Sequence, residues 1–169
     1  MNNNSIGKYY YSASTKSDSW GQQISGSVRA FDGNQHPSPV SASKTINVPL
    51  FVTKDGTQNA LLTSVTVSVH TYSQHNYTGD GGSGTASISV KAPDGTELGS
   101  ISRTANGANT TSDGTTTVSL LGKTSLENAD HLVISFTGSA SASGTSSQYS
   151  IGRGEFTASL TDCTYLVKS

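Results

Sequence analysis

The sequence predicts an all-β fold, a single-domain β-sandwich or jelly roll of about eight or nine antiparallel strands. Apolar and polar residues alternate in short runs along most of the chain, helical periodicity is nearly absent, and turn residues separate the runs. The 169 residues are enough for one domain with its own core. We assign residues 13–169 to this domain and residues 1–12 to an N-terminal arm that orders against a partner.

The first half of the domain contains three strands with alternating faces. They cover residues 23–32, 44–52 and 62–72, and their inward residues are Ile24, Val28 and Ala30, then Ile46, Val48, Leu50 and Val52, then Val65, Val67 and Val69. Pro49 has no N–H to donate to a neighbouring strand, so its strand should lie at a sheet edge or carry a bulge. Residues 54–62 leave room for one short helical turn at most.

The second half begins with a hairpin. Residues 85–91 alternate, the tight turn Pro93-Asp94-Gly95 follows, and a partner strand carries Leu98 and Ile101. Further strands cover residues 115–121, 131–136 and 155–167. The last strand changes parity, because its apolar residues are first Phe156, Ala158 and Leu160 and then Cys163, Tyr165 and Val167. A one-residue change of register turns every side chain over, so we predict a bulge near Asp162.

Loops and core residues complete the predicted fold. Three long loops rich in Gly and Ser are expected at residues 32–43, 73–84 and 138–150. The four phenylalanines alternate with polar neighbours and should belong mostly to the core: Phe31, Phe51, Phe136 and Phe156. Cys163 is the single cysteine, which excludes an internal disulfide and a Cys-rich zinc site. We expect it to be a small buried core residue.

The composition argues against several classes of partner. Charged residues make up 12% and hydrophobic residues 32% of the chain, against roughly 25% and 45–50% in typical domains. The net charge is −1 and the ten Lys and Arg are scattered, so we expect neither nucleic acid nor anionic lipid as a partner. No stretch approaches the roughly 18 apolar residues of a membrane helix, and no secretory signal is recognisable.

The acidic residues are typical of turns and not of catalysis. Five of the eight aspartates precede a glycine, a pair that favours tight turns: Asp32, Asp55, Asp80, Asp94 and Asp113. The other acids show no pairing of the kind that a glycosidase needs. The sequence also contains no HExxH, no Gly-x-Ser-x-Gly, no P-loop and no Rossmann fingerprint. We therefore predict a protein that is not an enzyme and has no organic cofactor.

A structural calcium ion is the one metal that we consider further. Asp80, within Thr78-Gly79-Asp80-Gly81-Gly82, is the best candidate ligand. The alternative is a solvated loop, because no second acid lies nearby in the sequence. His70, on the polar face of its strand, and His75, in a loop, form no recognised metal-binding motif.

Several aromatic residues lie in polar, Ser-rich surroundings, unlike the core phenylalanines. An exposed ring can stack on a sugar, while nearby Asn, Gln or His side chains bind its hydroxyl groups. On this reasoning the candidate glycan-binding residues are Trp20, Tyr72, His75, Tyr77 and Tyr149. The alternative is that these rings only cover the ends of the sandwich.

The strand series Val65–Val69, Ala86–Val90, Lys91–Leu98 and Leu132–Phe136 resembles the jelly-roll and galactose-binding-like modules of bacteriophage tails, baseplates and capsid decorations. The resemblance covers roughly the last two-thirds of the chain and transfers no functional residue, since a fold does not fix function. It implies a virion structural protein, made in the host cytoplasm, that assembles with copies of itself or other virion proteins and touches host glycans. The alternative is an extracellular carbohydrate-binding module excised from a secreted bacterial enzyme or adhesin.

Overall fold

The computed structural model describes residues 9–11, 23–30, 39–54, 58–75, 81–143 and 150–168, with the side chains of residues 39–51, 60–74, 82–142 and 152–166. These residues form ten strands and one short 3-10 helix. The elements are β1 (Tyr9–Tyr11), β2 (Gln23–Ala30), β3 (Val40–Pro49), β4 (Phe51–Lys54), β5 (Gln58–His75), β6 (Gly81–Lys91), β7 (Glu97–Asn106), β8 (Thr110–Ser119), η2 (Thr124–Leu126), β9 (His131–Ser143) and β10 (Ser150–Lys168).

The strands form two antiparallel sheets that are wired as a jelly roll. Sheet A contains β2, β10, β5 and β8 in spatial order, with β1 beside the end of β10 and β4 beside the start of β5. Sheet B has the order β3-β9-β6-β7. Only β6 and β7 form a hairpin within one sheet among the eight long strands, whereas the other connections cross between sheets. This arrangement of eight strands in two sheets confirms the predicted fold class.

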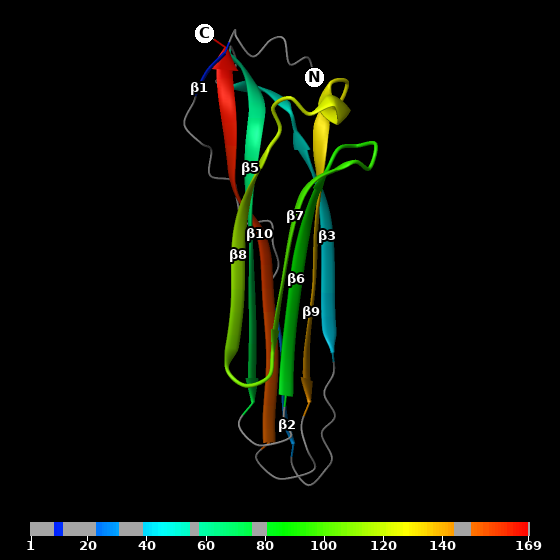
Figure 1. Cartoon of the computed structure of the whole chain (residues 1–169), viewed down its shortest axis with the longest axis vertical. Helices are drawn as coiled ribbons and strands as arrows, with labels where there is room; N and C mark the ends of the chain where they lie inside the picture. Colours follow the sequence, from blue (N-terminus) through cyan, green and yellow to red (C-terminus); the bar gives the residue numbers. More distant parts are fainter. Residues whose placement is uncertain are drawn as a thin grey trace.

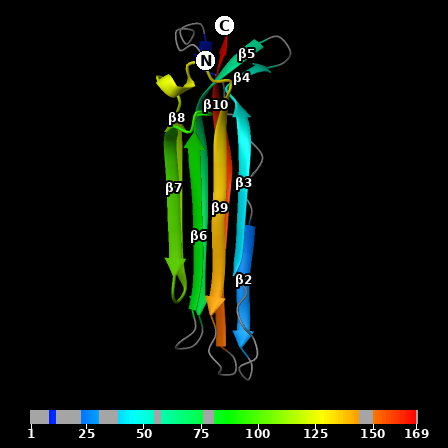
Figure 2. The same cartoon turned by 90° about the vertical axis from the view of Figure 1, so that its right-hand side faces the viewer.

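The molecule is long and narrow. The two sheets run as separate layers along the long axis (Figure 1), and the four strands of sheet B lie side by side when this layer faces the viewer (Figure 2). β5 alone has 18 residues, a length of about 60 Å in extended backbone. The helix η2 and the segment β4 lie at one end, which we call the upper end (Figure 1).

Large aliphatic side chains fill the space between the sheets toward the upper end. On the strands, these inward residues alternate with outward polar residues. The period-2 pattern of the sequence therefore predicted which residues enter the core. The most deeply buried members of this core are Leu50, Leu62, Ile88, Leu120, Leu126, Leu132, Ile134 and Leu160. Phe136, Phe156 and Cys163 are also buried, as expected.

At the opposite end, which we call the glycine end, the two sheets come into backbone contact. A Cβ atom added to Gly84 of β6 would lie 2.0 Å from the carbonyl oxygen of Glu155 in β10. A Cβ atom on Gly154 of β10 would lie 1.9 Å from the carbonyl oxygen of Ser83. Facing sheets ordinarily pack about 10 Å apart, with side chains between them. Glycine at these inward positions therefore lets the sandwich taper toward this end.

This close packing corrects the predicted long loops at residues 73–84 and 138–150. β5 continues to His75, β6 already begins at Gly81, and β9 runs to Ser143. The third loop, at residues 32–43, ends earlier than expected because β3 begins at Val40. Small residues are uncommon in strands, so they suggested loops. Here they are strand residues because only they fit between sheets this close together.

Three further expectations were wrong. Gln58–Leu62 belongs to β5 and makes no helical turn. Phe51 is 46% exposed, because the chain passes from sheet B to sheet A at Leu50 and it is Leu50 that enters the core. Asp113-Gly114 lies in the middle of β8 and makes no turn.

Other local predictions are confirmed. β3, which ends at Pro49, is an edge strand of sheet B. The register of β10 against β5 shifts between Leu160 and Asp162, where the bulge was expected. In the turn between β6 and β7, Gly95 has φ of 93° and the backbone N–H of Thr96 donates to Oδ1 of Asp94 at 2.8 Å.

The N-terminal arm is described only in part. Tyr9–Tyr11 forms β1 and pairs with the end of β10 in the same chain, with Tyr9 opposite Lys168. The remainder of residues 1–12 lies outside the described residues, as does Phe31. An arm that orders against a partner stays a prediction.

Candidate functional site

The outer face of sheet A presents a row of polar side chains along β5. The odd-numbered residues from Val65 to Ser73 enter the core, so the even-numbered ones face outward: Thr66, Ser68, His70, Tyr72 and Gln74. β8 flanks this row on one side and β10 on the other. Strand pairing therefore brings together side chains that lie far apart in the sequence.

Hydroxyl pairs occupy the part of this face nearer the upper end. The Oγ1 atoms of Thr66 and Thr117 are 2.9 Å apart, and Oγ of Ser68 is 2.8 Å from Oγ1 of Thr115. Each hydroxyl group both donates and accepts a hydrogen bond. Cross-strand hydrogen bonds thus hold these hydroxyl side chains, and Asp162 of β10 lies opposite Thr66.

The next pair along the row carries charge. Nδ1 of His70 lies 2.5 Å from Oδ1 of Asp113, and the two side chains are 44% and 55% exposed. Asp113 is directly opposite His70 in the β5–β8 pairing. From β7, Nε of Arg103 donates to the backbone carbonyl of Asp113 at 3.2 Å, and its guanidinium group covers Gly114. Strand β8, which carries the Asp113 carboxylate, is therefore held by its pairing with β5 and by the hydrogen bond from Arg103.

Tyr72 follows His70 on the same face. Its cross-strand neighbours are Thr111 on β8 and Glu155 on β10. Glu155 is only 13% exposed and forms an ion pair with Arg153, two residues earlier on the same strand. Tyr72 thus lies between Thr111 and Glu155, whose negative charge is balanced by Arg153.

A shallow hollow lies beside the His70–Asp113 pair. Its lining combines the carboxylate, the imidazole and several hydroxyl groups with Val69 and Gly114: Ser68, Val69, His70, Asp113, Gly114, Thr115, Thr157 and Ser159. The hollow extends across three strands because the side chains that line it on the outer face are short. Such a surface offers many hydrogen-bond donors and acceptors with little net charge.

Sheet B presents a more uniform outer face. Twelve hydroxyl residues form three cross-strand rows: Ser41, Ser139, Thr85 and Thr104; Ser43, Thr137, Ser87 and Ser102; Thr45, Ser135, Ser89 and Ser100. Oγ of Ser87 is 2.7 Å from Oγ1 of Thr137. These rows contain no aromatic and no charged side chain, unlike the outer face of sheet A.

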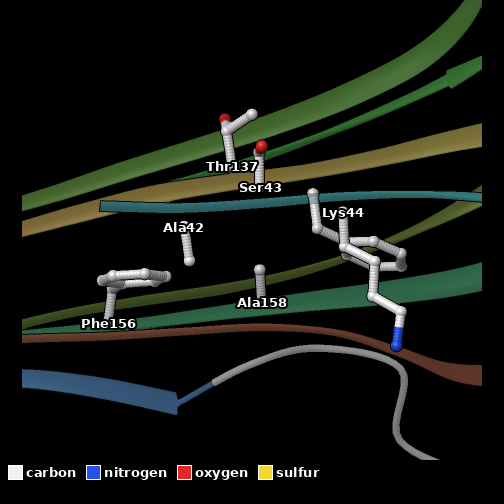
Figure 3. A pocket seen from close by; sticks show the side chains of 7 residues that line it. Ala42, Ser43, Lys44, Thr137, Phe156 and Ala158 are labelled. Atoms are coloured by element: carbon white, nitrogen blue, oxygen red, sulfur yellow. The ribbon is translucent and has the colours of Figure 1, made fainter. Parts of the chain in front are cut away.

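A small gap lies between the sheets beneath β3. Figure 3 shows Ala42 and Ala158 pointing toward one another across it, with the ring of Phe156 beside them, while Ser43 and Thr137 point away. Its volume is about 10 Å³, which is room for a single water molecule. The gap is a packing defect at the sandwich edge and is too small for an organic ligand.

Among the described residues, three groups have shifted pKa values. Burial raises the pKa of the Tyr165 hydroxyl, and the nearby Cys163 adds to the shift. At the upper end, hydrogen bonding to His131 lowers the pKa of Asp130, and the Thr96 N–H lowers that of Asp94. Neither acid is near the outer face of sheet A, since both belong to the connections at the upper end.

The predicted glycan-binding residues are described unequally. Tyr72 lies on the outer face of sheet A, and His75 is the last residue of β5, with its side chain outside the described part. Trp20, Tyr77, Tyr149 and the calcium candidate Asp80 lie outside the described residues. The pairing of His70 with Asp113 and of Arg153 with Glu155 was not predicted from the sequence. The outward parity of His70 was a usable signal, but Asp113 was assigned to a turn.

Neither a metal cluster nor a spanning helix is present in the described part of the chain. No group of three or more His, Cys, Asp or Glu side chains there is arranged to hold a metal ion. The same residues contain no helix long and apolar enough to cross a membrane.

Comparisons with known proteins identify no family. No family model and no curated protein matches the chain. Among solved structures, one of infectious bursal disease virus, Gt strain, matches with a TM-score of 0.31 and 14% identity, covering 90% of this chain and 38% of that one. The structure of T=1 particles derived from infectious bursal virus matches with a TM-score of 0.27 and 16% identity, covering 92% and 37%. The chain thus spans less than two-fifths of the length of either.

Proposed function

We propose that this chain is a non-enzymatic structural module of a virus particle, specifically of a bacteriophage virion, and that it contacts host glycans. The observation that carries the proposal is the jelly-roll wiring, with β2-β10-β5-β8 facing β3-β9-β6-β7. Viral capsid proteins and lectins are among the proteins that use this architecture. Because proteins with many different functions share the jelly-roll fold, the proposal also has to be supported by features of the molecular surface.

The absence of catalytic groupings in the described residues fits a structural role. Asp94 and Asp130 line one open hollow at the upper end with His131, and no group of three or more His, Cys, Asp or Glu in the described residues is arranged to hold a metal ion. Asp113 and Glu155 each lie beside a basic side chain. The Asp80 calcium site stays a prediction.

Exposed apolar side chains supply a contact for assembly at the upper end. Phe51 and Leu121 are the large hydrophobic residues exposed in the described part of the chain. Both residues lie beside the same short stretch of β5. The N–H of Leu62 donates to the carbonyl oxygen of Leu50, which precedes Phe51, at 2.8 Å. The N–H of Leu120, which precedes Leu121, donates to the carbonyl oxygen of Thr63 at 2.9 Å. Single exposed apolar residues are ordinary on protein surfaces, and it is part of the proposal that these two contact another copy of the chain.

The experiment is a mass measurement by light scattering on the full chain and on the double variant Phe51→Ser, Leu121→Ser. We expect the full chain to assemble and the double variant to lose mass. Ser100→Ala with Ser102→Ala, on the outer face of sheet B, is the matched control and should assemble like the full chain. A monomeric full chain would contradict the assembly proposal.

The alternative function is a carbohydrate-binding module excised from a secreted protein, and Tyr72 beside Glu155 and Arg153 is the observation that favours it. Deleting residues 1–12 separates the two functions. An excised module should remain a monomer and keep its glycan binding, whereas a virion module should lose mass when the arm is removed.

A further inference from the structure

We propose that the outer face of sheet A holds a binding site for a neutral saccharide, centred on His70, Asp113 and Tyr72. The inference deepens the glycan-contacting part of the proposed function and rests on it. It differs from the sequence-based candidates in two of these three residues. It also places the site on a sheet face and not on the loops at the end of the sandwich.

The His70–Asp113 pair supplies two acceptors side by side. An ionised carboxylate can only accept, so Nδ1–H of His70 donates to Oδ1 of Asp113 over 2.5 Å. In the neutral ring that makes this hydrogen bond, Nε2 is an acceptor. Nε2 and Oδ2 then form a pair of acceptors on half-exposed side chains, which suits two neighbouring sugar hydroxyl groups that donate.

Hydroxyl side chains extend the same surface. Ser68 and Thr115 line the hollow beside the pair, as do Thr157 and Ser159 on its far side. Ser68 and Thr115 already bond to one another at 2.8 Å, which holds their oxygen atoms in place before a ligand arrives. Ordered polar groups lose less conformational entropy on binding than free ones do.

Tyr72 supplies the apolar contact. It stands two residues from His70 on the same face of β5, a separation of about 7 Å along the strand, which is close to the width of one sugar ring. Its ring can therefore lie against a sugar that is hydrogen-bonded by the His70–Asp113 pair. The outer face of sheet B has hydroxyl groups in similar rows but no aromatic residue in them, so it lacks this combination.

The charges of the site select against acidic sugars. Arg153 is engaged by Glu155, and Arg103 reaches only the backbone of Asp113 and Gly114 from β7, so the Asp113 carboxylate is the charged group that faces outward beside His70. A sialic or uronic acid would meet this carboxylate with the same sign of charge. A neutral hexose or N-acetylhexosamine would not.

The test is titration of the full chain with glucose, galactose, mannose and N-acetylglucosamine oligosaccharides, and with sialyllactose as the acidic probe, monitored by NMR. We expect at least one neutral probe to bind and sialyllactose not to bind. Asp113→Asn and Tyr72→Ala should each weaken that binding about tenfold or more, the effect of losing a hydrogen bond to a charged group or a stacking ring.

The matched control is Asp130→Asn, which removes the other His–Asp pair, where Nδ1 of His131 is 2.5 Å from Oδ1 of Asp130 at the upper end. It should leave binding unchanged, and circular dichroism should show that all variants are folded. Absence of binding to every neutral probe, or equal losses in Asp113→Asn and Asp130→Asn, would overturn the site. The assembled mass of Asp113→Asn should equal that of the full chain. Loss of mass in that variant would instead show that the outer face of sheet A is a contact between copies. The saccharide site and the assembly proposal can therefore be disproved independently of one another.

Discussion

The ring of Phe156 in β10 packs directly on the backbone of Gly138 in β9. A Cβ atom at Gly138 would lie 2.1 Å from Cδ2 of this ring. The two residues belong to different sheets, so this contact sets the distance between the layers near the middle of the sandwich. The dependence of the fold on small residues can be tested here first.

Replacing Gly138 by alanine should destabilise the fold by about 1–3 kcal/mol, because an overpacked core must move the Phe156 ring or the strands. Urea denaturation measures the change. Gly114→Ala is the control, since its Cβ would meet only the guanidinium end of Arg103, which can swing away. Equal stability of the two variants would show that the Phe156 ring does not define the spacing.

Replacing Gly84 by alanine should cost more than replacing Gly138. The obstacle is a backbone oxygen, that of Glu155 at 2.0 Å from the added Cβ atom, and backbone cannot rotate aside as a ring can. Hydrogen exchange should show faster exchange in β6 and β10 at the glycine end. Ser83→Ala, on the outer face beside it, should leave the exchange unchanged. Unaltered exchange in Gly84→Ala would contradict the backbone contact between the sheets.

The thiol of Cys163 should be unreactive in the folded protein. The residue is 4% exposed and faces the core just after the bulge at Asp162. A thiol reagent such as dithionitrobenzoate should react at once in denaturant and only slowly without it. Fast reaction under native conditions would place the thiol at the surface. It would contradict the register shift that turns Cys163 toward the core.

High pH should weaken the fold through Tyr165. Burial raises the pKa of this hydroxyl group above its unfolded value of about 10. The folded state thus holds the proton more tightly, and this contribution is present below the unfolded pKa and is lost as the pH rises through the folded pKa. Tyr165→Phe should lose less stability than the natural chain between about pH 9 and pH 11, as measured by denaturant titration. Identical pH profiles would contradict the shift.

The period-2 pattern predicted the fold class and the main core residues. Val65, Val67 and Val69 are buried as expected, since alternation of side chains across a sheet depends only on backbone geometry. The Asp162 bulge was predictable for the same reason, because the parity of the apolar residues changes there. The strand ends were harder to predict, since glycines such as Gly82 and Gly84 indicate loops unless the opposing sheet is known.

The candidate site was predictable only in part. Tyr72 was selected from its polar surroundings, and it does lie on an outer face. Asp113 was assigned to a turn because Asp-Gly favours turns, yet strand β8 includes it and pairs it with His70, 43 residues away in the sequence. Local sequence carries no information about which residues pair across strands, so the His70–Asp113 pair required the topology.

The most direct test of the central claim is sedimentation velocity of the full chain over a wide range of concentrations. A structural module of a virus particle should form a defined assembly of several copies, with the monomer appearing only on dilution. A single monomeric species at every concentration would contradict the account and favour the isolated carbohydrate-binding module.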